Sequence, residues 1–270
     1  MRRWIVAGPI LLLLAAIIGA QPKNDFRFSI LGDRTGAAVP GIYESIWREI
    51  GGLHPDFAIN VGDTIEGASD RLAESQWREL RPIWSRYRFP IYFTPGNHDI
   101  WSEHSLDVYK KETGHSNYYS FNYQDAHFTV LDNSQTLFLS DGQLKFLEDD
   151  LKANQGRSPK FVFFHVPDWI AFLKLGSGEF PLHQLARRYG VSYVVSGHGH
   201  QFVRMTRDGI TYLEVGSSGA KLKGEGFAEG WFYHHVVGVV KGSKVELSVK
   251  ELDPPGGRGR LIRVEDWGRK

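Results

Sequence analysis

Short apolar runs rich in β-favouring residues alternate along this chain with segments whose apolar residues recur at helical spacing. Such runs are typical of buried strands, and the segments between them of helices packed on a sheet. Pro40 and Pro181 mark the starts of two helices, and Ser140 with Gln143 forms a capping-box pattern before another. The predicted helices are residues 40–50, 72–84, 144–151 and 181–189. The predicted strands of this part are residues 26–31, 56–61, 91–94, 161–164 and 191–195.

Alternating patterns typical of antiparallel strands also occur. Residues 118–121 and 127–131 alternate like a hairpin, and 211–215 and 231–249 read as antiparallel strands. A β/α alternation combined with hairpins indicates a mixed α/β domain in which helices cover a mixed sheet. From residue 254 to 270 the chain is rich in Gly, Pro and Arg, and we expect a loosely ordered tail.

The N-terminus carries an apolar stretch behind two arginines. Residues 4–20 follow Arg2 and Arg3 and end in small residues, which favours a cleaved export signal over residues 1–20. The alternative is a retained anchor helix, although a span usually needs about 20 apolar residues. We therefore expect an exported protein, periplasmic or extracellular, with one domain over 21–253 and membrane contact only if the anchor is retained.

The charge balance and the cysteine content bear on nucleic-acid binding and on the types of metal ligand. Lys plus Arg number 32 against 31 for Asp plus Glu; without Arg2 and Arg3 the balance is 30 against 31. A near-neutral domain gives no indication of a nucleic-acid-binding surface. The chain has no cysteine, so oxygen and imidazole would have to hold any metal.

Polar residues that can bind metals follow five of the predicted strands. Because the carboxyl ends of parallel strands meet at one edge of a sheet, these side chains are expected to share one crevice. A mixed oxygen and nitrogen set favours Mn, Fe or Zn. Six side chains are too many for one catalytic ion, which must keep an open position, so two ions fit better. The residues are Asp33, Asp63, Asn97 with His98, His165, and His198 with His200.

These motifs resemble those of the calcineurin-like metallophosphoesterase superfamily. The matching motifs are Gly62-Asp63, Gly96-Asn97-His98-Asp99, His165 and Gly197-His198-Gly199-His200. The resemblance covers about residues 26–220, and residues 117–132 are similar to the purple-acid-phosphatase side of the superfamily. It implies a four-layer α/β/β/α sandwich with two mixed sheets flanked by helices.

The resemblance also implies a role for each matching residue. Asp63 would bridge two divalent ions (Mn, Fe or Zn). Phosphate monoesters or diesters would be hydrolysed in line by a metal-bridging hydroxide, without a covalent intermediate. Asn97 and His98 would lie beside the substrate, and Asp99 would orient the His98 imidazole by accepting its other N–H. The further ligands implied are Asp33 and His200 for the first ion, and Asn97, His165 and His198 for the second.

The first motif departs from the family pattern. Where the family has Asp-x-His, this chain has Asp33-Arg34-Thr35, so one ligand of the first ion is missing. Purple acid phosphatases also lack it and use a Tyr three residues after the bridging Asp, a position held here by Glu66. Our hypothesis is that the Glu66 carboxylate replaces the ligand; the alternative is water, held by Thr35.

Two more residues are candidates for substrate binding. Arg34 is expected in the same crevice, where its guanidinium would bind a phosphate oxygen, although an arginine in a surface loop is common. His115 is expected in a substrate loop. Two other functions stay open: a non-catalytic metal- or phosphate-binding protein, favoured by the altered first motif, and a hydrolase of non-phosphate esters.

Overall fold

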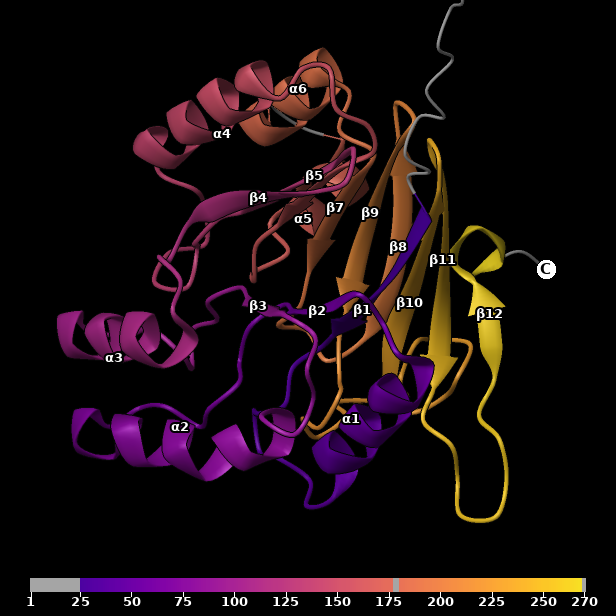
Figure 1. Ribbon diagram of the computed structural model, residues 1–270. Coiled ribbons are helices and arrows are strands. Elements are labelled where there is room, and N and C mark those ends of the chain that lie inside the picture. The colour runs from indigo at the N-terminus through magenta and orange to yellow at the C-terminus, as the bar shows by residue number, and fades with distance from the viewer. Residues whose placement is uncertain (1–24, 177–179, 269–270) are drawn as a thin grey trace, which may run out of the picture.

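The computed structural model describes residues 25–176 and 180–268, and the predicted signal segment 1–20 lies outside them. Two six-stranded sheets face each other across an apolar interior (Figure 1). The first sheet has the order β12 (Leu261–Arg263), β11 (Lys244–Glu251), β10 (His234–Lys241), β1 (Asp25–Leu31), β2 (Phe57–Asn60) and β3 (Ile91–Phe93). The second has the order β4 (Tyr119–Tyr123), β5 (Ala126–Val130), β6 (Lys160–Phe163), β7 (Tyr193–Ser196), β9 (Ile210–Val215) and β8 (Phe202–Arg207).

Helices cover the outer face of each sheet. The cover of the first sheet is α1 (Ile42–Leu53), α2 (Asp70–Trp84) and α3 (Glu103–Thr113). The cover of the second is α4 (Asp141–Ala153), α5 (Trp169–Leu175) and α6 (Pro181–Tyr189). The arrangement confirms the predicted mixed α/β fold with two mixed sheets flanked by helices. Among the described residues, no helix is long and apolar enough to span a bilayer.

Aromatic rings from both sheets fill the interior. Phe28 of the first sheet stacks on Phe57 with ring centroids 5.3 Å apart, and it meets Phe161 of the second sheet edge-on at 5.4 Å. Phe161 in turn stacks on Phe128 at 4.8 Å. These side chains are fully buried, and such contacts add to the stabilisation from apolar burial. The interior therefore holds the two sheets at a defined separation.

Parallel pairing aligns the strand ends that matter for function. In the first sheet β1, β2 and β3 run parallel, and in the second β5, β6, β7 and β9 do. The loops after these strands consequently leave from equivalent edges.

Five segments differ from the sequence-based expectation. The tail is not loose throughout, because β12 pairs with β11 and is followed by the short helix η1 (Val264–Asp266), whose Val264 is buried. Helix α1 runs through Gly51 and Gly52 and ends at Leu53, with His54 left-handed (φ 49°). Strand β8 and helices α3 and α5 were not predicted, since each has few fully buried apolar positions to reveal its period.

Candidate metal centre

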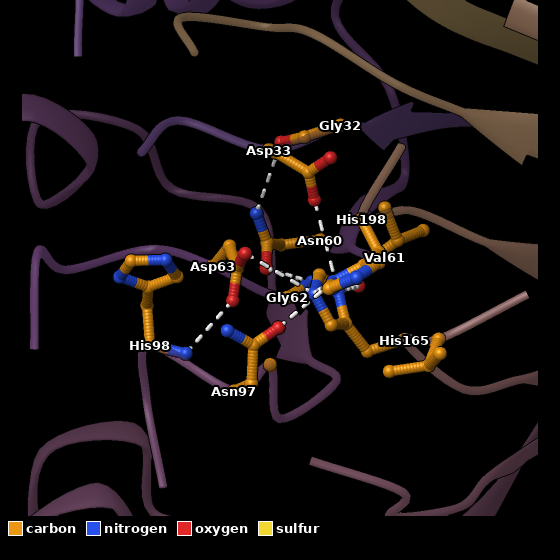
Figure 2. A network of polar contacts seen from close by, with 12 residues as sticks. Gly32, Asp33, Asn60, Val61, Gly62, Asp63, Asn97, His98, His165 and His198 are labelled. Carbon is orange, nitrogen blue, oxygen red and sulfur yellow. Dashed lines mark hydrogen bonds and ion pairs between the residues drawn. The ribbon is translucent and has the colours of Figure 1, made fainter. Parts of the chain in front are cut away.

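Side chains from the two sheets meet at the carboxyl ends of their parallel strands (Figure 2). Asp33, Asp63 and Asn97 follow β1, β2 and β3 of the first sheet, and His165 and His198 follow β6 and β7 of the second. One ligand atom each from Asp63, His165 and His198 lies within 4.8 Å of the others. The expected convergence of strand-end residues is therefore present.

The ring nitrogens of His165 and His198 face one another. His165 Nδ1 donates to the carbonyl oxygen of Val61 at 2.8 Å, which directs its Nε2 into the cluster. Against the effect of burial, Asp63 and Asp33 raise the pKa of this imidazole to about 10, so a bound ion would take the place of its Nε2 proton. That Nε2 lies 3.2 Å from Asp63 Oδ2 and 3.3 Å from His198 Nδ1. His198 Nδ1 also lies 2.8 Å from Asn97 Oδ1. A carboxylate, an amide oxygen and two imidazole nitrogens thus surround one point, as a borderline divalent ion requires.

The backbone around Asp63 aims its carboxylate at this point. Asp63 adopts φ 54°, a left-handed conformation that is costly for a residue with a side chain. The N–H of His98 donates to its Oδ1 at 2.9 Å. A Cβ on Gly96 would lie 2.2 Å from the Asp63 nitrogen and 2.3 Å from its Oδ1. Glycine at position 96 is therefore needed for the close approach of these two loops.

Asp33 carries a carboxylate that no hydrogen bond of ordinary geometry satisfies, although the backbone N–H of His198 lowers its pKa slightly. It is fully buried, neither side-chain oxygen has a hydrogen-bond partner, and His165 Nδ1 lies 3.7 Å from Oδ1. A Cβ on Gly197 would lie 2.5 Å from that oxygen, so the space beside it is kept small. Buried polar groups are almost always satisfied, and a lone buried carboxylate is especially costly. A bound cation is the partner this geometry fits.

The other residues expected at the first ion position are His200 and Thr35. His200 Nδ1 donates to the Lys221 carbonyl at 2.8 Å, which leaves Nε2 as the free ligand atom. Thr35 occupies the place of the missing histidine, and its hydroxyl is buried without a partner. A Cβ on Gly36 would lie 2.7 Å from His200 Nε2, so only glycine fits beside that imidazole.

The electrostatics of the cluster also favour a cation. Burial raises the pKa of Asp33 well above its usual value, and the nearby Asp63 raises it further, against the opposing charge of His165. Burial likewise lowers the pKa of His198 to about 4, helped by the charge of His165, so this imidazole is neutral at pH 7 and available as a ligand. Divalent charge would favour the ionised carboxylates and the neutral imidazoles together.

The family model of the calcineurin-like phosphoesterases matches residues 27–202. The chain belongs to this family. Purple acid phosphatase 23 of Arabidopsis thaliana is 26% identical over 218 residues, covering 70% of this chain and 46% of the relative. The chain thus spans about half the length of that relative.

Solved structures of similar fold include phosphatases of this family. A purple acid phosphatase from yellow lupin (Lupinus luteus) seeds has a TM-score of 0.68 at 15% identity, covering 89% of this chain and 53% of that one. A dimetal phosphatase from Danio rerio has a TM-score of 0.63 at 13% identity, covering 88% and 97%. At such identities the likeness shows the fold.

Among the residues predicted for this site, Glu66 lies against the loop that carries Arg34 and Ala38. Its Oε1 accepts from the Ala38 N–H at 3.3 Å and lies 3.9 Å from Arg34 Nη1, and the side chain is 45% exposed. The carboxylate thus contacts the Arg34–Ala38 loop, and its role as a metal ligand stays a prediction. Arg34 also donates to the Thr64 carbonyl at 3.3 Å, and its side chain stays 21% exposed at the rim.

The expected contact between Asp99 and the His98 ring is not made. Asp99 is fully buried and accepts backbone N–H groups instead: Gly96 at 2.9 Å, Thr64 at 2.8 Å and Ile65 at 3.2 Å. Asp99 therefore joins the Gly62-Asp63 loop to the Gly96-Asn97-His98 loop.

His115 also lies elsewhere than expected. Its ring stacks on Tyr119 at 4.7 Å and on Tyr92 at 5.6 Å, and Nε2 lies 3.3 Å from the carbonyl of Ile91. Ile91 begins β3, whereas the predicted metal ligands follow the opposite ends of their strands. The prediction that His115 lines the substrate site is thus not supported, because the ring packs at the wrong end of the sheet.

Two residues near the centre escaped the sequence analysis. Asn60, the last residue of β2, accepts from the Gly62 N–H at 2.7 Å and donates to the Gly32 carbonyl at 3.5 Å. It therefore connects the loops that carry Asp33 and Asp63. Glu214 of β9 lies buried behind the His198–His200 loop. A polar residue inside an apolar strand pattern is the signal that would have indicated both.

Proposed function

We propose that this chain hydrolyses phosphate monoesters or diesters with two divalent ions held between the sheets. The observation that carries the proposal is the buried carboxylate of Asp33, which no hydrogen bond of ordinary geometry satisfies, beside the cluster of Asp63, His165 and His198. One ion would satisfy only part of this set, because Asp33 and His200 fall outside the group of Asp63, His165 and His198 whose ligand atoms lie within 4.8 Å of one another. Mn, Fe and Zn suit the mixed ligands.

The ligand sets of the two positions are unequal. Asp63, Asn97, His165 and His198 would hold one ion, and Asp33, Asp63 and His200 the other. Thr35 offers the second set only a neutral hydroxyl. When bound, such ions polarise phosphoryl oxygens and lower the pKa of water for in-line attack. The rest of the chemistry depends on how side chains of this chain orient the ester.

His98 is suited to act on the leaving group. The Glu66 carbonyl oxygen lies 2.6 Å from its Nδ1 and can only accept, so Nδ1 carries a proton. Nε2 is then the atom that holds or releases a proton toward a substrate. In the imidazolium form it would donate to the leaving oxygen as a general acid. Because His98 follows Asn97 in the chain, its imidazole would lie beside the proposed metal ligands.

Arg34 is proposed to bind a phosphate oxygen at the rim of the site. Its guanidinium has one contact to the Thr64 carbonyl and a long one to Glu66, which leaves further N–H groups free to donate. A charge-assisted hydrogen bond of this kind would hold the ester in place while leaving the metal ligands undisturbed.

An exported location and the phosphate-ester partner follow from different observations. The N-terminal pattern of residues 1–20 supports export, either with cleavage or as an anchor. The family and the site support a phosphate ester as substrate, and the near-neutral composition offers no basis for a nucleic-acid-binding surface.

The test is an assay of the full chain on a chromogenic phosphomonoester and the matching bis-ester. It is run after chelation and after addition of Mn, Zn or Fe. We expect hydrolysis only with metal, and the ratio of the two rates gives the ester class. A protein that binds metal and phosphate yet hydrolyses neither ester would instead support the non-catalytic alternative, which the altered position Thr35 favours.

A further inference from the structure

The carboxylate of Glu214 lies directly behind the loop that carries His198 and His200. Glu214 belongs to β9 and is 2% exposed. A Cβ on Gly199, between the two histidines, would lie 2.0 Å from Glu214 Oε1. Since Gly199 does not adopt a left-handed φ, its glycine is required by this close approach rather than by its own conformation.

Two backbone N–H groups of the loop face this carboxylate. The N–H of Gln201 donates to Glu214 Oε1 at 3.3 Å. The N–H of Gly199, which lies 3.0 Å from the Gly197 carbonyl oxygen, also interacts with it. These groups stand on either side of His200. The carboxylate thus fixes the backbone before and after that residue.

The loop needs such support because its two histidines are strained. His198 has φ 73° and His200 has φ 64°, both left-handed. This conformation is unfavourable for each residue that has a side chain. Without an external acceptor the loop would gain by returning to an ordinary conformation, and both imidazoles would then turn away from their ligand positions.

The burial of Glu214 without an ion pair is the second observation. Burial raises the pKa of this carboxyl to about 7, so positive charge nearby is needed to keep it fully ionised at neutral pH. Among the described residues, Glu214 forms no ion pair within 4.0 Å, so its burial is not offset by a salt bridge. The nearest cationic influence comes from Lys223, whose Nζ donates to the His198 carbonyl at 3.2 Å. An unpaired buried carboxylate is costly unless positive charge is near. Divalent ions in front of the loop would supply that charge.

We propose that Glu214 is a positioning residue of the metal centre. It holds the His198–His200 loop in its left-handed form and places a negative charge behind the ions. The inference rests on the proposed metal centre. Glu214 lies outside the sequence motifs that contain the predicted ligands.

The test compares metal affinity in Glu214→Ala, Glu214→Gln and Glu229→Ala with that of the unaltered full chain. Affinity for Mn²⁺ is measured by titration calorimetry after chelation, together with the Tm of each metal-free protein. Residues that orient metal ligands typically change affinity about 10–100-fold, and we expect a loss of this size for Glu214→Ala. Glu214→Gln should lose less, because the amide keeps one acceptor but not the charge. Glu229 is an exposed carboxylate on a neighbouring loop, and its loss should change nothing.

The outcomes separate this inference from the proposed function. If the unaltered chain binds no metal, the metal centre itself is wrong. If it binds metal and folded Glu214→Ala binds with the same affinity, Glu214 has only a structural role and the inference is overturned. Should Glu214→Ala fail to fold, Glu214→Gln decides, and an affinity within about twofold of the unaltered chain would overturn the inference.

Discussion

His98 Nδ1 lies 2.6 Å from the carbonyl oxygen of Glu66, so the backbone of one loop fixes which nitrogen of the imidazole carries a proton. Replacing His98 by Ala should lower kcat about 10²–10⁴-fold, the usual contribution of a general acid. Metal content should be unchanged, because only the backbone N–H of His98 contacts Asp63. Steady-state kinetics with elemental analysis checks both. Loss of bound metal would show that the ring is a ligand instead.

Glu66 provides the matched comparison. Glu66→Ala keeps the carbonyl that orients His98 and removes only the carboxylate, which contacts Ala38 and Arg34. We expect unchanged metal content and a rise in KM of a few-fold, through a less well-held Arg34. A drop from two bound ions to one would support the hypothesis that Glu66 is a ligand.

We expect the first metal position to be the weaker one, because Thr35 offers it only a neutral hydroxyl. Metal titration of the chelated chain should show two steps of unequal affinity, and Thr35→His should tighten the weaker one. A change of roughly tenfold or more is expected, since even residues that merely support a ligand alter affinity by about that factor. Thr35→Val is the control and should leave the weaker step weak. Equal steps in the unaltered chain would contradict this prediction.

Gly96 and Gly52 differ in what a new methyl group would meet. In Gly96→Ala the Cβ would approach the Asp63 nitrogen to 2.2 Å, so the loop must move and metal-dependent activity should fall by at least about 10²-fold. In Gly52→Ala the new Cβ would meet nothing within 4 Å. Because position 52 is helical, the free energy of unfolding should rise by about 0.5–1 kcal/mol. Thermal unfolding and kinetics on both variants provide the check; full activity in Gly96→Ala would refute the close approach.

Asp150 should stabilise the fold at neutral pH and lose this contribution in acid. Burial raises its pKa, but hydrogen bonds from His127, Ser120 and Thr129 outweigh this and lower it below the usual value. A lowered pKa stabilises the fold above the unfolded value near 3.9, and the stabilisation is lost as pH falls through the folded value. Asp150→Asn should therefore be less stable at pH 7, with a difference in Tm that narrows in acid. A difference independent of pH would contradict the assignment.

The sequence was informative where local chemistry alone determines the structure. A strand followed by Gly-Asp or Gly-His indicates both a turn and a candidate metal ligand. Asp63 and His198 could therefore be predicted to lie close together. Helix α3 could not, because its buried residues are Ser105, Val108 and Tyr109, too few and too polar to reveal a period. Strand β8 is an edge strand in which Arg204 interrupts the apolar pattern.

Tertiary contacts account for the rest. Asp99 follows His98 directly in the chain, yet its carboxylate faces the Thr64 backbone, which only the packing of two loops determines. Likewise, His115 is adjacent in sequence to a plausible substrate loop, but stacking on Tyr119 holds it at the far end of β3. Residues 261–263 form β12 because β11 offers a free edge, although their composition resembles that of a flexible tail.

The division of ligands between the sheets has a mechanical consequence. Asp33 and Asp63 belong to one half of the sandwich and His165 and His198 to the other, so an ion bound among them tethers the halves at a single edge. Chelation releases this tether while the aromatic interior around Phe28 and Phe161 stays packed. The two sheets can then separate only at the edge that carries the ligands. Faster amide exchange at the carboxyl ends of β2 and β6 would report that separation.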